Sequence, residues 1–281
     1  MVLSFPSFRT AVLPLLLGGL IMSAFFVRAP EHVSSAAPVS PPDTLQDVRQ
    51  EIFDATNAER RAAGRSALSS DPGLRNLACR HTRDMLMRDF MGHENPEGVG
   101  PGERAARYHR RLIGDTGENV LSRIGPMDQS PPELADELMR RWMESPPHRK
   151  NILRRAFTHL GVCVMQDGDQ LRATQSFARV RGWVSPPLPF RVTTGQSVPM
   201  TVSATPAHRL TASQYDLWSP TEERKVAGPR ALAGTLHVPD TTGAFRVRFY
   251  FPESDRYAVH LGPALTIETP PTSSQSPSSK R

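Results

Sequence analysis

The first half of the chain carries apolar residues at the three- and four-residue spacing of amphipathic helices. The first predicted helix is capped by Thr44 and ends at Gly64, and the second opens at Asp71 with a proline in its first turn. A short helix is predicted over 103–108, and a longer one follows Ser130. The first helix has residues at helical spacing at Leu45, Val48, Ile52, Ala55 and Glu59. The second carries Leu74, Leu77, Ala78, His81 and Met85 on one side, and the inward residues of the longer helix after Ser130 are Leu134, Leu138, Met139 and Trp142.

After these helices the hydrophobic period changes to two. Residues 159–165 and 171–179 are predicted strands, and Asp167 with Gly168 between them is typical of a β-hairpin turn. Helices that enclose a small antiparallel sheet form an α/β/α sandwich. We therefore predict an α/β domain of this architecture over residues 43–182.

A proline-rich stretch, 185–189, marks a boundary, and the helical period does not return beyond it. Phenylalanine and valine alternate with arginine and tyrosine from 245 to 251, which indicates a strand buried on one face. We predict a smaller all-β, immunoglobulin-like sandwich over 186–268, and Tyr257 resembles the late-strand tyrosine of such domains. The predicted strands are 190–194, 198–204, 213–218, 235–238, 245–251 and 257–261.

The two ends of the chain differ from the rest in composition. Residues 11–27 are almost wholly apolar and lie between two arginines, which is typical of an export signal, and a spacer rich in Pro, Ser and Ala follows to residue 42. Small residues at 34–37 suit a signal peptidase, whereas an uncleaved membrane anchor is the alternative. We expect export to the periplasm or the cell exterior, and a disordered tail over 269–281.

The chain carries a formal net charge of +6, but its basic residues are spread along the sequence and interleaved with acids. This distribution does not indicate a nucleic-acid partner. One basic cluster stands out, namely Arg149, Lys150, Arg154 and Arg155. It is either a solvated helix face or a rim that attracts anionic ligands.

The chain has two cysteines, Cys79 and Cys163. In an exported protein they form either one disulfide or two buried thiols, since free cysteine is among the most buried residue types. Neither cysteine has a His and an acid at nucleophile spacing within its own segment, so thiol chemistry is not expected.

Three short segments carry the candidate chemistry. In chain order they read His-x-Asn-Pro-x-Gly from His93, Gly-Glu-Asn around Glu118, and Trp-x-x-Ser-Pro-x-His-Arg-x-Asn-Ile-Leu around His148. Together with residues 161–164 and 174–177, they resemble the CAP superfamily (cysteine-rich secretory proteins, antigen 5, pathogenesis-related proteins) in its bacterial SCP-like form. The resemblance covers about residues 44–182.

The resemblance implies the α/β/α fold and a cavity lined by two histidines and two acids. His93, Glu118 and His148 match three of these four residues. The second acid is replaced by Ser145, and the adjacent Glu144 points elsewhere on a helix. Two further residues fit the family motifs, and we expect them to hold the fold: Asn151 and Gln175.

Two imidazoles and a carboxylate suit zinc or another divalent cation, which leaves an open position for water when the protein supplies three ligands. Without metal, the same groups suit acid–base chemistry, because histidine titrates near neutral pH. Each of His93, Glu118 and His148 also has a purely structural interpretation, such as a bond to the backbone of its own loop. The chain has no P-loop, GxSxG or HExxH motif.

Three hypotheses for function remain from the sequence. The first is binding of a lipid-like or cell-wall ligand at His93, Glu118, His148 and Arg149, since CAP proteins are associated with lipid and sterol binding. The second is a metal-dependent, peptidase-like hydrolase that activates water between the two histidines. The third is a structural or adhesive envelope protein whose β-sandwich binds a partner. The sequence leaves the ligand and the oligomeric state open.

Overall fold

The computed structural model describes residues 43–126, 128–205 and 211–271, all within one compact unit, Pro38–Arg281. The predicted export signal and spacer lie outside the described residues, as does most of the predicted tail. Among the helices of the described part, none is long and apolar enough to cross a membrane.

The first part of the chain forms a sheet with the strand order β1-β3-β4-β2. Strand β4 pairs antiparallel with both β2 and β3, and β1 runs parallel to β3. The strands are β1 Ser69–Ser70, β2 Leu112–Ile124, β3 His159–Asp167 and β4 Gln170–Ser185. The helices are α1 Asp43–Ala62, α2 Pro72–Met87, α3 Pro101–Tyr108, α4 Pro131–Glu144 and α5 Pro146–Ile152.

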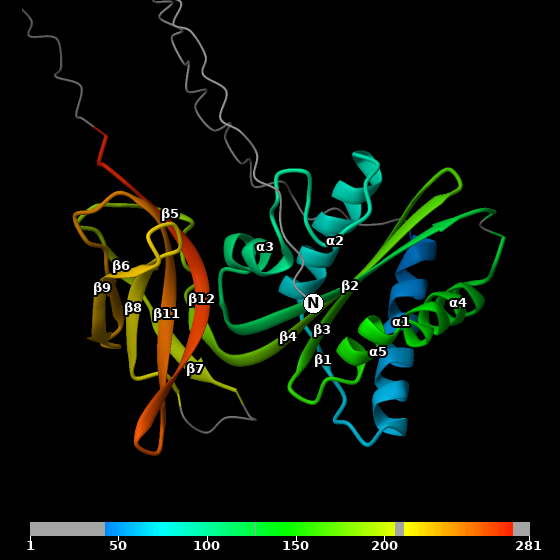
Figure 1. The fold of residues 1–281 in the computed structure, drawn as a ribbon, viewed down its shortest axis with the longest axis horizontal. Coiled ribbons are helices and arrows are strands. Elements are labelled where there is room, and N and C mark those ends of the chain that lie inside the picture. Colours follow the sequence, from blue (N-terminus) through cyan, green and yellow to red (C-terminus); the bar gives the residue numbers. More distant parts are fainter. Residues whose placement is uncertain (1–42, 127, 206–210, 272–281) are drawn as a thin grey trace, which may run out of the picture. The chain divides into compact units, whose positions relative to one another are not determined.

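Helices cover both faces of this sheet (Figure 1). On one face, Ile52 of α1, Leu138 of α4 and Ile152 of α5 share a core with residues of β2, β3 and β4. On the other face, Leu74 of α2 and Ala105 of α3 pack against residues of β2 and β4. The predicted α/β/α sandwich is therefore confirmed.

The main difference from the sequence prediction is strand β2, which the hydrophobic pattern does not indicate. Its middle, residues 114–119, is rich in Gly, Asp and Asn, residue types that are depleted in strands. Glu118 and Asn119 therefore lie on a strand and not in a loop. Helix α1 begins at Asp43, so Thr44 is a helical residue and the prediction that it is the cap was wrong.

The second part is β-rich, with a sheet in the order β5-β12-β11-β8-β9 and a separate β10–β6 pair. Alternate residues of β11, from Phe245 to Phe251, are buried as predicted. They share a core with Val198 of β6 and Leu236 of β10. The strands are β5 Arg191–Thr193, β6 Ser197–Pro199, β7 Thr201–Ala204, β8 Gln214–Ser219, β9 Arg224–Ala231, β10 Thr235–His237, β11 Gly243–Glu253 and β12 Arg256–Glu268.

Two details of the β-rich part differ from the prediction. Strand β9 was not predicted. Tyr257 follows the β11–β12 turn directly, is 48% exposed and packs edge-on against Tyr250, so its likeness to a buried late-strand tyrosine was wrong.

The two parts share structure across the predicted boundary. Strand β7 pairs with the end of β4, and Ile113 and Val184 belong to the core of the β-rich part. The division of the chain at 182 and 186 therefore stays a prediction.

Helix α2 is held against β3 by a disulfide between Cys79 and Cys163. The close approach requires a glycine on the strand, because a Cβ at Gly161 would lie 2.1 Å from the backbone nitrogen of Arg75. Of the two alternatives left by the sequence, the structure therefore shows the disulfide.

The disulfide is expected to contribute strongly to stability. It joins residues 84 positions apart, and closing a loop of that length stabilises the fold by about 4 to 5 kcal/mol in the chain-entropy model. We expect Cys79→Ala/Cys163→Ala to lower the free energy of unfolding by roughly this amount in urea titrations. A reducing agent should shift the wild-type midpoint and leave that of the variant unchanged; a wild-type midpoint insensitive to reduction would contradict the assignment.

A buried histidine on β12 couples stability to pH. Burial, followed by the positive charge of Arg181, lowers the pKa of His260 to about 4, and its ring packs edge-on against Phe251. The unfolded chain binds this proton with the ordinary pKa of 6.5, so between these pH values the unfolded state holds more protons. Neutral His260 therefore makes its full contribution to the free energy of unfolding above pH 6.5, and this contribution falls as the pH is lowered toward 4.

We therefore expect His260→Gln to flatten the pH dependence of the unfolding free energy between about pH 6.5 and 4. Exposed His237 offers a matched control, and His237→Gln should keep the wild-type slope. Equal slopes for wild type and His260→Gln in urea titrations across this range would show that the buried ring does not cause the dependence.

Candidate functional site

The site lies at strand β2, which ends the strand order of its sheet. Helix α5 packs here through amide side chains. Asn151 donates a hydrogen bond to the backbone oxygen of Glu118 at 3.0 Å, and Asn119 donates to the backbone oxygen of His148 at 3.1 Å. These bonds satisfy backbone carbonyls of the strand and the helix, and they place His148 beside β2.

A second set of amide bonds anchors Asn119 inside the domain. Its side chain donates to Gln175 of β4 at 3.0 Å, and Gln175 donates to the hydroxyl of Thr56 in α1 at 2.8 Å. Asn119, Gln175 and Thr56 are fully buried. Asn151 and Gln175 therefore hold the fold, in agreement with the expectation from the sequence.

Because alternate residues of a strand face opposite sides, Glu118 points away from Asn119, toward α2 and α3. Its side chain is only 3% exposed, and both of its oxygens accept hydrogen bonds. One accepts from Nδ1 of His93 at 3.0 Å, and the other accepts from Arg104 of α3 at 2.8 Å. A buried carboxylate requires such compensation.

Arg104 also fixes the loop that carries His93. Its second guanidinium nitrogen donates to the backbone oxygens of His93 and Val99, at 2.8 and 2.6 Å. Glu118 and Arg104 thus hold His93 on its buried side. The His93 side chain remains 51% exposed, so its imidazole is open to a ligand.

His81 of α2 completes the buried side of the site. Its Nε2 donates to the backbone oxygen of Gly92 at 2.8 Å and lies 3.7 Å from a Glu118 oxygen. Its buried Nδ1 has no hydrogen-bond partner among the described residues. The sequence pattern placed His81 at an inward helical position but did not assign it to the site, and it gave no signal for Arg104.

The histidines of the site have pKa values shifted in opposite directions. The hydrogen bond to Glu118 raises the pKa of His93 against the opposing effect of burial. Burial, and then the nearby charge of His93, lower the pKa of His148. Burial also lowers the pKa of His81. His93 thus retains a proton to higher pH than usual, while His148 loses its proton at a lower pH than usual.

The structure therefore brings His93 and Glu118 into direct contact and places His148 within electrostatic range of His93. Arg149 lies elsewhere, in a basic groove described below, and its predicted role as a ligand-binding residue of this site stays a prediction. Glu144 forms an exposed ion pair with Arg140, so it does not replace the missing second acid.

A metal held by His93, Glu118 and His148 together does not fit this arrangement. Both oxygens of Glu118 are engaged by hydrogen bonds, so the carboxylate orients the imidazole of His93. Within the described residues, no group of three or more His, Cys, Asp or Glu is placed to hold a metal ion. Zinc or another divalent cation stays a prediction that would rest on the two imidazoles.

The described fold is a three-layer α/β/α domain, and its candidate site consists of histidines and a carboxylate. Comparison with known sequences identifies the family with which this domain agrees. Residues 53–177 match the model of the cysteine-rich secretory protein family, CAP. This region is therefore a CAP domain, in agreement with the resemblance found in the sequence. The curated uncharacterized protein YkwD of Bacillus subtilis is 30% identical over 129 residues, which are 46% of this chain and 47% of that protein. The match thus spans about half of that relative.

Two solved structures are also similar to this chain. An extracellular protein containing an SCP domain from Bacillus anthracis is 28% identical, with 51% of this chain and 45% of that chain covered and a TM-score of 0.41. An outer surface protein from Borrelia burgdorferi is 16% identical, with 49% of this chain and 96% of that chain covered and a TM-score of 0.42.

The hydrogen bond between Glu118 and His93 is directly testable. We expect Glu118→Gln to lower the pKa of His93, because the variant removes the charge that favours the imidazolium and leaves the effect of burial. Titration of the imidazole resonances by NMR measures this change. Glu97→Gln, in the same loop, is the matched control, since Glu97 pairs with Arg88. An unchanged His93 pKa in Glu118→Gln would contradict the assigned contact.

Proposed function

We propose that this chain is an exported CAP-domain protein that binds a lipid-like or cell-envelope ligand at the site formed by His93, Glu118 and His148. One observation carries the proposal. The imidazole of His93 is half exposed, while the groups that orient it, Glu118 and Arg104, are buried. A preorganised polar group that faces solvent suits recognition of a ligand's polar head.

The surroundings of His93 support an amphipathic ligand. Met87, at the end of α2, and Met91, two positions before His93, are 70% and 46% exposed. Methionine is flexible and polarizable, and it is frequent at surfaces that accept varied apolar groups. A ligand with a polar head and an apolar body matches this combination.

Two observations support export. The apolar stretch 11–27 has the composition of an export signal. The Cys79–Cys163 disulfide fits an oxidising compartment, because disulfides persist outside the cytosol.

A hydrolase is the second candidate, and the opposite pKa shifts of His93 and His148 favour it. Paired groups whose pKa values are moved apart provide an acid and a base at the same pH. Here His93, with its raised pKa, would donate a proton, and His148, with its lowered pKa, would accept one. The metal-dependent form of this reaction and the adhesive role of the β-rich part stay predictions.

The binding proposal predicts that lipid or wall fragments copurify with the full-length chain. Mass spectrometry of organic and aqueous extracts should detect a ligand with the wild type and roughly thirtyfold less with His93→Ala/His148→Ala, since each of the two lost polar contacts costs about 1 kcal/mol. His237→Ala, a remote exposed histidine, is the control. Equal ligand in all three proteins, or none in any, would refute binding at this site. Turnover that is lost in both single histidine variants would replace binding with hydrolysis.

A further inference from the structure

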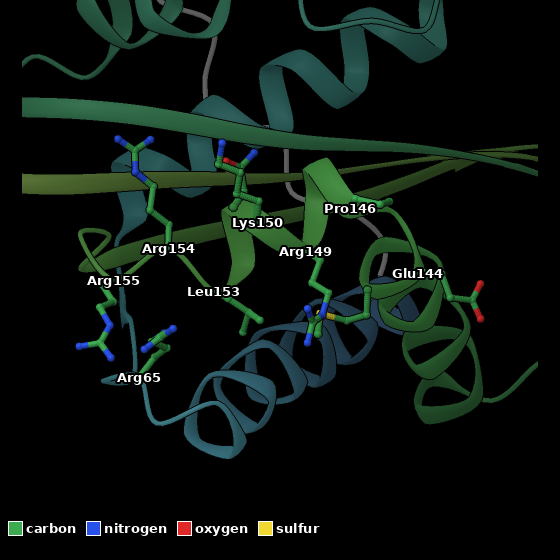
Figure 2. A pocket seen from close by; sticks show the side chains of 10 residues that line it. Arg65, Glu144, Pro146, Arg149, Lys150, Leu153, Arg154 and Arg155 are labelled. Carbon is green, nitrogen blue, oxygen red and sulfur yellow. The ribbon is translucent and has the colours of Figure 1, made fainter.

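A basic groove lies beside α5 and the segment that follows it. It has a volume of about 790 Å³, and Figure 2 shows the side chains that line it. Arg65 comes from the segment after α1, and the other basic residues come from α5 and the segment after it. The basic lining residues are Arg65, Arg149, Lys150, Arg154 and Arg155.

The positive charges of the groove are not neutralised within the described part of the chain. None of the five basic side chains forms an ion pair with a described carboxylate. The acid of the lining, Glu144, pairs with Arg140 at 3.1 Å and points away from the other labelled side chains (Figure 2). The buried Nε of Arg65 has no hydrogen-bond partner among the described residues.

A buried arginine, Arg60 of α1, holds together the two segments that line the groove. Its guanidinium donates hydrogen bonds to the backbone oxygens of Ser66, Ile152, Arg154 and Phe157, at 2.9, 2.7, 3.0 and 3.3 Å. These bonds tie the segment after α1 to the segment after α5. Arg60 thereby fixes both walls of the groove and adds a positive charge behind them.

We propose that this groove binds the phosphate groups of an anionic ligand. Arginine forks match phosphate oxygens in pairs, and several unneutralised arginines on a fixed backbone form a phosphate-binding arrangement. The groove also contains the partly buried apolar side chains of Met143 and Leu153, which suit the organic part of a phosphate ester.

The groove is a separate site from the one assigned to the histidines, because neither His93 nor Glu118 nor His148 lines it. The proposal therefore does not depend on the function proposed above. A phosphate group reaches such a groove either as the headgroup of an anionic lipid or on a soluble ester, and the two sources are separable by experiment.

The first test is calorimetric titration of the full chain with pyrophosphate. Lys150→Ala/Arg155→Ala removes two charges whose side chains hold no fold contact among the described residues. Lys225→Ala/Arg230→Ala removes the same charge from exposed positions on β9. We expect the groove variant to weaken binding roughly tenfold or more and the control variant to leave it unchanged.

The second test is cosedimentation with vesicles of phosphatidylcholine alone or with phosphatidylglycerol. Subtracting binding to neutral vesicles removes any contribution of the apolar residues 11–27. The groove variant should bind anionic vesicles roughly thirtyfold more weakly than the wild type, since each of the two basic residues removed contributes about fivefold near an anionic surface.

The outcomes separate the alternatives. If the groove variant, but not the control variant, binds pyrophosphate more weakly, a soluble phosphate ligand is supported. If the groove variant loses binding only to anionic vesicles, a lipid headgroup is supported. Equal losses of binding in the groove and control variants would show that binding depends on the net charge of the protein and not on the groove, which would overturn the proposal. Absence of binding to both probes would overturn it as well.

Discussion

The site depends on a buried carboxylate that the fold must compensate. Glu118 lies on a strand whose next layer is apolar, and an uncompensated charge there costs several kcal/mol. Arg104 and His93 provide the compensation, and Arg104 also binds two carbonyls of the His93 loop. The same set of hydrogen bonds therefore stabilises the carboxylate of Glu118 and positions the exposed imidazole of His93.

Polar groups in the opposite layer have a similar role for α5. The helix is short and has one buried apolar residue, Ile152, so its own packing is limited. Its position depends on Asn119 and Asn151 on one side and on Arg60 at its C-terminal end. Because these bonds are directional, they fix rotation as well as position. The histidine site and the basic groove therefore both depend on how α5 is held.

Periodicity predicted the long helices and the β3–β4 hairpin because their buried faces are regular. It failed at β2, where Glu118 and Asn119 replace apolar residues and tertiary contacts override weak strand propensity. The order of the CAP motifs along the sequence located His93 and His148. His81 and Arg104 lie around the carboxylate of Glu118 only in the folded structure, and no motif marks them. The disulfide was undecidable from sequence, because pairing depends on the separation of the two Cβ atoms.

The missing second acid bears on what this site can do. Ser145 stands in its place and ends α4 where α5 begins. Glu118 is then the one carboxylate assigned to the site, and its oxygens are already engaged with His93 and Arg104. A general base that must release its partners before accepting a proton is a poor catalyst, since reorganisation adds to the barrier. Proton transfer would rest on the two imidazoles, whereas ligand binding requires no such release. The geometry thus argues against Glu118 as a general base and is compatible with ligand recognition at the exposed imidazole of His93.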